Sequence, residues 1–210
     1  MRDRLMETGK FNAFACGWKE GMPNKPHIFN GWGKKIIQKT TYPENAKISI
    51  TTQGIKTLAL RIPSWCTSFQ MDAQYVIKDG YAYVQSPGCI TVEFDMPVLC
   101  MQVSEHVTKN SGRVALQRGP VIYCAEGIDN GKDLKNIFVD VNGDFRVAYD
   151  MVLGAHIIEA TAFRLRNKTK ELYRVYTADF EEIKLRLIPY YAFANREETQ
   201  MLVWLRARLS

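Results

Sequence analysis

Carboxylate side chains are the residues of this sequence that could most directly carry out catalysis. Two carboxyl groups held ~5–10 Å apart can act as acid and base, or as acid and nucleophile, in cleaving a glycosidic bond. The second half of the chain is rich in such groups, namely Glu126, Asp129, Asp140, Asp144, Asp179, Glu181 and Glu182. Nearly all of them fall in polar turns between apolar runs. We therefore predict that they lie on the solvated surface, and we assign no catalytic residue.

Histidine and cysteine, the usual ligands of zinc, are spaced without a ligand pattern. The three histidines are isolated, and the adjacent pair Glu105–His106 is too little to define an acid–base or metal site. The five cysteines contain no Cys-x-x-Cys pair, and their odd number argues against a complete disulfide framework. Cys89, Cys100 and Cys124 lie in apolar runs, where we expect free cysteine to be a small buried residue. The residues thus predict no metal site and no cofactor site in this chain.

The charge of the chain points to no nucleic-acid or membrane partner. Its 28 basic and 22 acidic residues leave a net charge of +6, but the basic residues are scattered. The densest stretch, residues 164–170, is typical of a solvated loop and lacks the aromatic residues that stack on single-stranded nucleic acid. No apolar run approaches the ~20 residues of a membrane-spanning helix. Residues 1–5 begin no apolar secretory leader, and free cysteines are compatible with the cytoplasm, so the compartment stays open.

Short alternating runs, separated by glycine, proline, asparagine and aspartate, predict an all-β chain. In residues 47–51 the alternation places Ile48 and Ile50 on one face. Residues 57–62 alternate in the same way, and Pro63 then ends the run because it has no N–H to donate. Short strands at this regular spacing are typical of a β-sandwich.

A polar interruption after about residue 104 divides the strands into two series. We predict two consecutive antiparallel β-sandwich domains, the first over residues 34–104 and the second over residues 105–210. Residues 1–33 show neither the helical nor the strand period. We expect them to form an irregular, poorly ordered lead-in.

Several segments carry more specific information than strand periodicity. They are residues 39–43 (Lys-Thr-Thr-Tyr-Pro), 60–66 (Leu-Arg-Ile-Pro-Ser-Trp-Cys), 112–124 (Gly-Arg-Val-Ala-Leu-Gln-Arg-Gly-Pro-Val-Ile-Tyr-Cys), 188–196 (Ile-Pro-Tyr-Tyr-Ala-Phe-Ala-Asn-Arg) and 201–205 (Met-Leu-Val-Trp-Leu). In this order and spacing they resemble the C-terminal half of the β-L-arabinofuranosidase-type enzymes, glycoside hydrolase family 127. The resemblance covers roughly residues 34–210, and the block at 112–120 is its most specific part.

The resemblance implies that the chemistry lies outside this chain. In that family an (α/α)-barrel comes first and holds a glutamate acid and a cysteine nucleophile that also ligates zinc near a Cys-Cys motif. Two β-sandwich domains follow the barrel. This sequence contains no Cys-Cys pair, and Cys16 does not match the motif. The resemblance therefore transfers no catalytic or metal residue, and the chain alone is expected to be inactive.

Five residues are candidate contacts for a carbohydrate or for the missing barrel: Trp65, Arg113, Arg118, Tyr190 and Tyr191. Trp65 and the two tyrosines follow prolines at strand ends, where an aromatic face could receive a sugar ring. The two arginines flank a strand that precedes a Gly-Pro turn. Turn and edge-packing roles explain all five positions without a ligand, and we favour that structural interpretation.

Two functions follow for the chain as a whole. The first is a non-catalytic C-terminal region that supports the catalytic barrel and lines its flank, with self-association through the surface that the barrel would cover. The alternative is a free-standing carbohydrate-binding module for an arabinose-containing oligosaccharide. A module needs a row of solvent-facing aromatic residues, whereas a supporting region needs an apolar surface.

Overall fold

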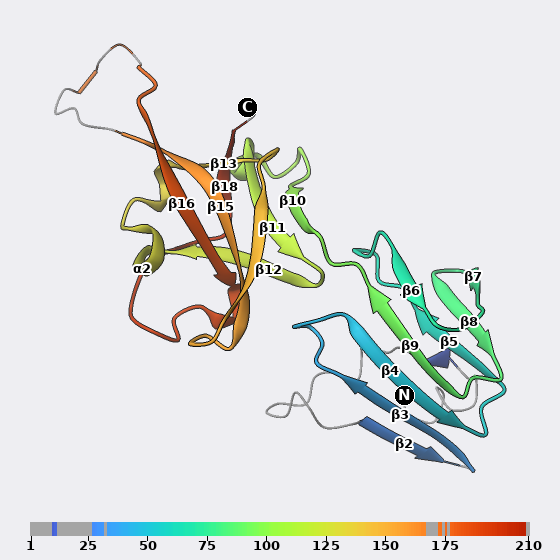
Figure 1. Cartoon of the computed structure of the whole chain (residues 1–210). Coiled ribbons are helices and arrows are strands. Elements are labelled where there is room, and N and C mark those ends of the chain that lie inside the picture. Colours follow the sequence, from blue (N-terminus) through green and yellow to red (C-terminus); the bar gives the residue numbers. More distant parts are fainter. Residues whose placement is uncertain are drawn as a thin grey trace. The chain divides into compact units, whose positions relative to one another are not determined.

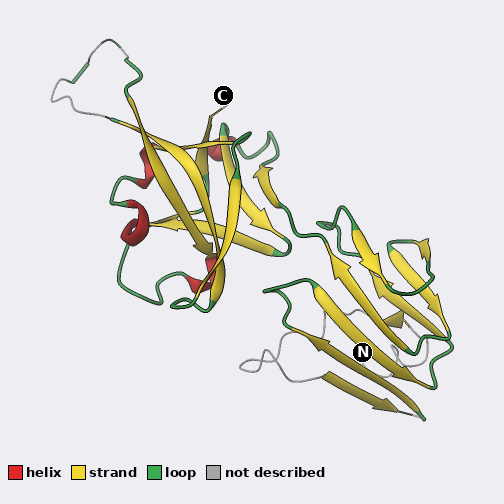
Figure 2. Cartoon of the chain, viewed as in Figure 1, coloured by secondary structure: helices red, strands yellow, loops and turns green. Residues whose placement is uncertain are grey.

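Two compact units make up the chain, unit 1 over Met1–Met96 and unit 2 over Pro97–Ser210. The computed structural model describes residues 10–11, 27–31, 33–166, 172–173, 175 and 177–208. Strands dominate the described residues of both units (Figure 2). The prediction of a chain built almost wholly from β-strands is confirmed.

The described part of unit 1 forms two sheets (Figure 1). The four-stranded sheet has the order β1-β5-β8-β7, and the five-stranded sheet has the order β2-β3-β4-β9-β6. The strands are β1 Lys10–Phe11, β2 His27–Gly31, β3 Lys34–Thr40, β4 Lys47–Gln53, β5 Thr57–Arg61, β6 Phe69–Met71, β7 Val76–Lys78, β8 Tyr81–Gln85 and β9 Cys89–Phe94. Neighbours pair antiparallel except for β1 and β5, which run parallel.

Both sheets of unit 1 bury side chains in one shared core. Ile48 and Ile50 of β4 are completely buried, and so is Leu58 of β5 in the other sheet. The predicted alternation is correct for β4, where Ile48 and Ile50 turn to the core and the residues beside them are more exposed, whereas in β5 the intervening Ala59 is buried as well. Burial of each such side chain contributes about 1.5–3 kcal/mol to the free energy of folding.

Two strands lie inside the predicted irregular lead-in. β1 pairs with β5, and β2 pairs with β3 over five residues. For these two segments the prediction is wrong, because pairing with neighbouring strands orders residues that show no alternation of their own. Residues 1–9, 12–26 and 32 of the lead-in lie outside the described residues.

Unit 2 contains a closed barrel rather than the predicted second sandwich. Its elements are β10 Val98–Gln102, η1 Thr108–Asn110, β11 Arg113–Arg118, β12 Val121–Glu126, α2 Gly127–Asn130, η2 Leu134–Asn136, β13 Ile137–Asp140, β14 Phe145–Asp150, β15 Ala155–Leu165, β16 Phe180–Pro189, η3 Tyr190–Ala192, β17 Met201–Leu202 and β18 Leu205–Arg208. Six of them, β11, β18, β13, β15, β16 and β12, pair in a ring. The ring closes because β11 pairs with both β18 and β12, and β13 runs parallel to β18. A sandwich and a barrel share the same alternation, so the sequence pattern does not distinguish them.

The two units divide earlier than the sequence suggested. The predicted boundary between residues 104 and 105 would leave β10 in the first domain. In the structure β10 pairs with β11 over all five of its residues, from Val98 opposite Arg118 to Gln102 opposite Val114. The division therefore falls between Met96 and Pro97, because strand pairing outweighs the polar break that follows β10.

The barrel buries side chains on both faces of its central strands. Val114, Leu116 and Leu187 lie in the interior cluster. A second cluster on the same strands contains Cys124 and Ile188, packed against residues that follow β16. This double burial explains why β12 and β16 each contain a continuous apolar run, at residues 121–125 and 187–189, instead of alternating throughout.

Replacing Leu187 by alanine should destabilise unit 2 by about 2–5 kcal/mol, because its side chain is 1% exposed and the resulting cavity would close only in part. Hydrogen exchange of the β15 and β16 amides in urea would report the loss within this unit. Leu172→Ala is the matched control, since Leu172 is 87% exposed and its loss should change stability by less than about 0.5 kcal/mol. Equal effects of the two substitutions would contradict the assigned core.

Candidate functional site

Trp65 lies in the turn after β5 and is half-buried. Its ring meets Phe94 edge to face, with 6.2 Å between centroids and 67° between planes, and packs against the unit 1 core. It also makes a side-chain hydrogen bond to Tyr42; burial outweighs this bond and raises the pKa of the Tyr42 phenol to about 12. Most of the indole surface is thus engaged inside unit 1.

The other four candidate contacts lie in unit 2. Arg113 and Arg118 stand at opposite ends of β11. The Nη1 of Arg113 donates to the backbone oxygen of Trp204 at 3.2 Å, and Arg113 pairs across the ladder with Arg206 of β18. The structure therefore does not bring the two arginines to one place.

Tyr190 and Tyr191 form the turn η3 directly after β16, and about half of each side chain is exposed. The antiparallel register of β15 and β16 brings this turn to the same end of the barrel as the turn between β14 and β15. Met151 and Val152 in that turn are each 89% exposed. We call the side chains of Tyr149, Met151, Val152, Tyr190 and Tyr191 the apolar end of unit 2.

A buried ionic cluster lies in unit 2, and the sequence did not predict it. Arg196 binds both oxygens of Asp129, with Nη1–Oδ1 at 2.9 Å and Nη2–Oδ2 at 2.5 Å, and also binds Glu126. The second carboxylate oxygen of Glu126 accepts the backbone N–H of Ala194 at 3.0 Å. Hydrogen bonds to Asp129 and then to Glu126 raise the pKa of Arg196 further above its ordinary value.

This cluster corrects the prediction that these carboxylates lie in solvated turns. The side chain of Glu126 is only 1% exposed and that of Asp129 is 12% exposed. Their partner Arg196 lies 70 and 67 positions further along the chain, so no local spacing reveals the pairs. One signal in the sequence could have indicated burial of Glu126. It comes directly after the apolar residues 121–125 of β12, and a charged residue at the end of a buried strand can itself be buried.

Arg186 extends the network to the β14–β15 turn. It binds Asp150, and its Nε lies 3.6 Å from Asp129. Asp150 in turn accepts the backbone N–H groups of Val152 and Leu153, each at 2.8 Å. The bond from Leu153, then those from Arg186 and Val152, lower the pKa of Asp150 against the opposing effect of burial. The network thus fixes the turn that carries the most exposed part of the apolar end.

Asn130 joins the short helix α2 to strand β16. Its side-chain amide donates to the backbone oxygens of Glu126 and Arg186, at 2.9 and 2.8 Å, and accepts the N–H of Arg186 at 2.9 Å. Because Asn130 is buried, these bonds satisfy groups that water does not reach. The helix therefore holds Asp129 at a set position between the two arginines.

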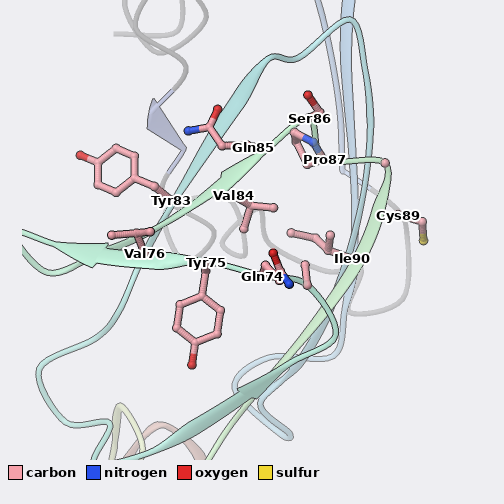
Figure 3. A pocket seen from close by; sticks show the side chains of 12 residues that line it. Gln74, Tyr75, Val76, Tyr83, Val84, Gln85, Ser86, Pro87, Cys89 and Ile90 are labelled. Carbon is pink, nitrogen blue, oxygen red and sulfur yellow. The ribbon is translucent and has the colours of Figure 1, made fainter.

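Unit 1 contains a hollow of about 680 Å³ that no sequence motif indicated (Figure 3). Its lining comes from the segment between β6 and β7 and from the neighbouring parts of β8 and β9. Val84 and Ile90 are buried there, whereas Gln74, Tyr75 and Ser86 are exposed. In Figure 3, Val84 and Ile90 point toward one another from their two strands.

Cysteine and metal chemistry add no further site among the described residues. Cys124 is buried, as expected, and burial raises the pKa of its thiol to about 12. Cys89 is exposed, contrary to the prediction, because it begins β9 at the rim of the hollow. The described part of the chain holds no group of three or more histidine, cysteine, aspartate or glutamate side chains that could bind a metal.

No helix in the described residues is long and apolar enough to cross a membrane.

Residues 98–206 match the family model described as the glycoside hydrolase family 127 C-terminal domain. The chain belongs to glycoside hydrolase family 127. The resemblance inferred from the sequence is therefore confirmed, and the match covers nearly all of unit 2.

Named relatives give the extent of the similarity. The chain is 32% identical over 200 residues to a non-reducing end β-L-arabinofuranosidase of Bifidobacterium longum subsp. longum, covering 83% of this chain and 30% of that protein. It resembles the crystal structure of a family 127 β-L-arabinofuranosidase from Geobacillus stearothermophilus T6 with a TM-score of 0.77 and 34% identity, covering 88% of this chain and 32% of that one. A further family 127 β-arabinofuranosidase structure gives a TM-score of 0.71 at 27% identity, over 87% of this chain and 33% of the other. The chain thus spans about a third of the length of these relatives.

Removing the carboxylate of Glu126 should destabilise unit 2 strongly. Glu126→Ala leaves the N–H of Ala194 without an acceptor and removes one of the two carboxylates that bind Arg196, while Asp129 remains; we expect this to cost about 2–4 kcal/mol of unfolding free energy. Glu159→Ala is the control, because Glu159 pairs at 3.6 Å with an arginine whose side chain is 79% exposed and should contribute less than about 1 kcal/mol. Denaturant unfolding of both variants measures the difference, and a loss below 1 kcal/mol for Glu126→Ala would refute the role of the cluster.

Asp150 should make stability depend on acidity. Its pKa is lower in the folded chain than its ordinary value of 3.8, so its contribution is present above about pH 4 and is lost as the pH falls through the folded pKa. Between about pH 5 and pH 2, Asp150→Asn should therefore lose less stability than the unmodified chain. Asp144→Asn, a substitution at an exposed position of unit 2, is the control and should lose as much unfolding free energy over this pH range as the unmodified chain. If all three proteins lose the same amount, the role assigned to Asp150 is contradicted.

Proposed function

We propose that this chain is the non-catalytic C-terminal region of a β-L-arabinofuranosidase-like glycoside hydrolase, whose catalytic residues lie in another part of the enzyme. The observation that carries the proposal is the family match of residues 98–206 to a C-terminal domain, in a chain that spans about a third of its relatives. Its role is mechanical: it packs against the catalytic part and supports it.

The apolar end of unit 2 supports this role. Met151 and Val152 are almost fully exposed, and Tyr149, Tyr190 and Tyr191 are about half exposed. Soluble proteins seldom leave large apolar side chains together in water unless a partner covers them. We propose that the catalytic barrel of the enzyme covers this end.

The ionic network gives the apolar end its fixed shape. Asp150 holds the β14–β15 turn through two backbone N–H groups, and Arg186 anchors Asp150 to β16. On the other side, Arg196 and Ala194 tie the segment after η3 to Glu126. Glu126 is committed to these bonds and is buried, so it is not positioned to protonate a bound substrate.

The purified chain should not hydrolyse a chromogenic β-L-arabinofuranoside. The Bifidobacterium relative, assayed in parallel, provides the positive control. Turnover by the chain that survives repeated purification and falls with added chelator would refute the proposal, because it would show a complete metal-dependent active site within these 210 residues.

The same preparation tests the apolar end. Sedimentation should show self-association at high concentration, since no barrel covers these side chains. A double substitution of Met151 and Val152 by aspartate should reduce the association, whereas Leu172→Asp, at an equally exposed position between β15 and β16, should leave it unchanged. A monomeric unmodified chain would count against the apolar end as the covered surface.

A further inference from the structure

The hollow of unit 1 arises where the chain passes from one sheet to the other. The pairing of β6 with β9 ends at Met71 opposite Val92, and the pairing of β7 with β8 begins at Val76 opposite Tyr83. Strands β8 and β9 both extend beyond this passage. The hollow therefore lies at an open edge of the two sheets and reaches inward to their shared core.

The hollow has an apolar floor and a polar, uncharged rim. Val84 and Ile90, each 3% exposed, form the floor together with buried Pro87. Gln74 and Ser86 on the rim carry an amide and a hydroxyl. Among the described residues, none that lines the hollow is charged.

The rim holds hydrogen-bonding groups that the described residues do not use. Neither Gln74 nor Ser86 has a side-chain hydrogen bond to another described residue. The ring of Tyr75 is held against Phe69 with 5.2 Å between centroids, and the side chain of Tyr75 remains 39% exposed. By contrast, the Gln85 amide oxygen already accepts a bond from Thr57 at 2.8 Å. Three neutral side chains, those of Gln74, Tyr75 and Ser86, are thus available to a ligand.

The backbone of Ser86, on the rim of the hollow, has a conformation that is energetically unfavourable for a non-glycine residue. Its φ is +44°, in the left-handed region that non-glycine residues seldom adopt. A hydrogen bond from its N–H to the oxygen of Lys56, at 2.7 Å, helps to hold it. Such conformations persist where surrounding structure imposes them, and they occur often at ligand sites.

We propose that this hollow binds a neutral saccharide of one or two rings. A sugar ring has an apolar C–H face that suits the floor of Val84, Pro87 and Ile90. Its hydroxyl groups both donate and accept hydrogen bonds, which suits the amide and hydroxyls of the rim. A volume of about 680 Å³ lies within the range of small-molecule pockets.

The uncharged lining selects against other small ligands. From the described lining residues, a phosphate or carboxylate would gain no cation in exchange for its lost water, and a cation would gain no carboxylate. The site shares no residue with the five contacts predicted from the sequence, and it does not rest on the accessory role proposed for the whole chain. It would bind sugar in unit 1 whether or not unit 2 packs against a catalytic barrel.

Calorimetry and amide NMR of the full chain test this site with an arabinose disaccharide, and with glucuronic acid as the charged comparison. We expect millimolar or tighter binding of the disaccharide, with shifts at Gln74, Tyr75 and Ser86, and at least tenfold weaker binding of glucuronic acid. Gln74→Ala should weaken disaccharide binding about fivefold, the effect of one net hydrogen bond. Gln70→Ala, at an exposed glutamine of β6 outside the lining, should leave it unchanged.

A second variant at the rim gives an independent measurement. The hydroxyl of Ser86 is exposed and makes no hydrogen bond to another described residue, so Ser86→Ala should fold normally and weaken disaccharide binding about fivefold. Circular dichroism checks the fold of each variant. The proposal is overturned if the disaccharide shows no heat of binding and no amide shifts at tens of millimolar, if Gln74→Ala and Ser86→Ala both bind it as the original chain does, or if glucuronic acid binds equally well.

Discussion

The architecture of unit 2 depends on strand β11, because two different strands pair with the two ends of one of its edges. One edge of β11 carries β10 along its length, while the other is shared between β18 at Arg113 and Val114 and β12 at Gln117 and Arg118. Because one strand serves both neighbours, the sheet closes on itself and its central strands have no free edge. An edge without a partner would invite pairing with other chains.

Closure of the ring also places the charged residues that hold the outer segments. β12 pairs with β16 as far as Ala125 and ends at Glu126 opposite Met201 of β17, and helix α2 follows at once with Asp129 and Asn130. From this corner the network reaches β16 through Arg186 and the segment after η3 through Arg196. Removing water from these charges is costly. The multiple hydrogen bonds to each carboxylate offset that cost, so the network defines one arrangement of the turns rather than adding a large net stability.

The sequence predicted those features that depend on neighbours along the chain. Alternation correctly identified the buried face of β4, because side chains in a strand point to opposite sides regardless of what lies beyond. Closure of the barrel was not predictable in this way, since it depends on which strands meet and not on how each one is patterned. The same reason hid Glu126, whose partner lies 70 positions away, and the hollow, whose floor is made by strands of two different sheets.

The strand that completes the ring of unit 2 has a consequence for biosynthesis. β18, at Leu205–Arg208, pairs with β11 and with β13, so the ring stays open until this strand has left the ribosome. The sheets of unit 1, by contrast, are complete by Phe94 and can form while unit 2 is still being made, since domains generally fold as they are synthesised. During that interval the edges of β11 and β13 that β18 will occupy have no partner. Nascent chains are therefore vulnerable to mispairing until β18 has emerged, and slow translation of the stretch between β13 and β18 would lengthen the exposure.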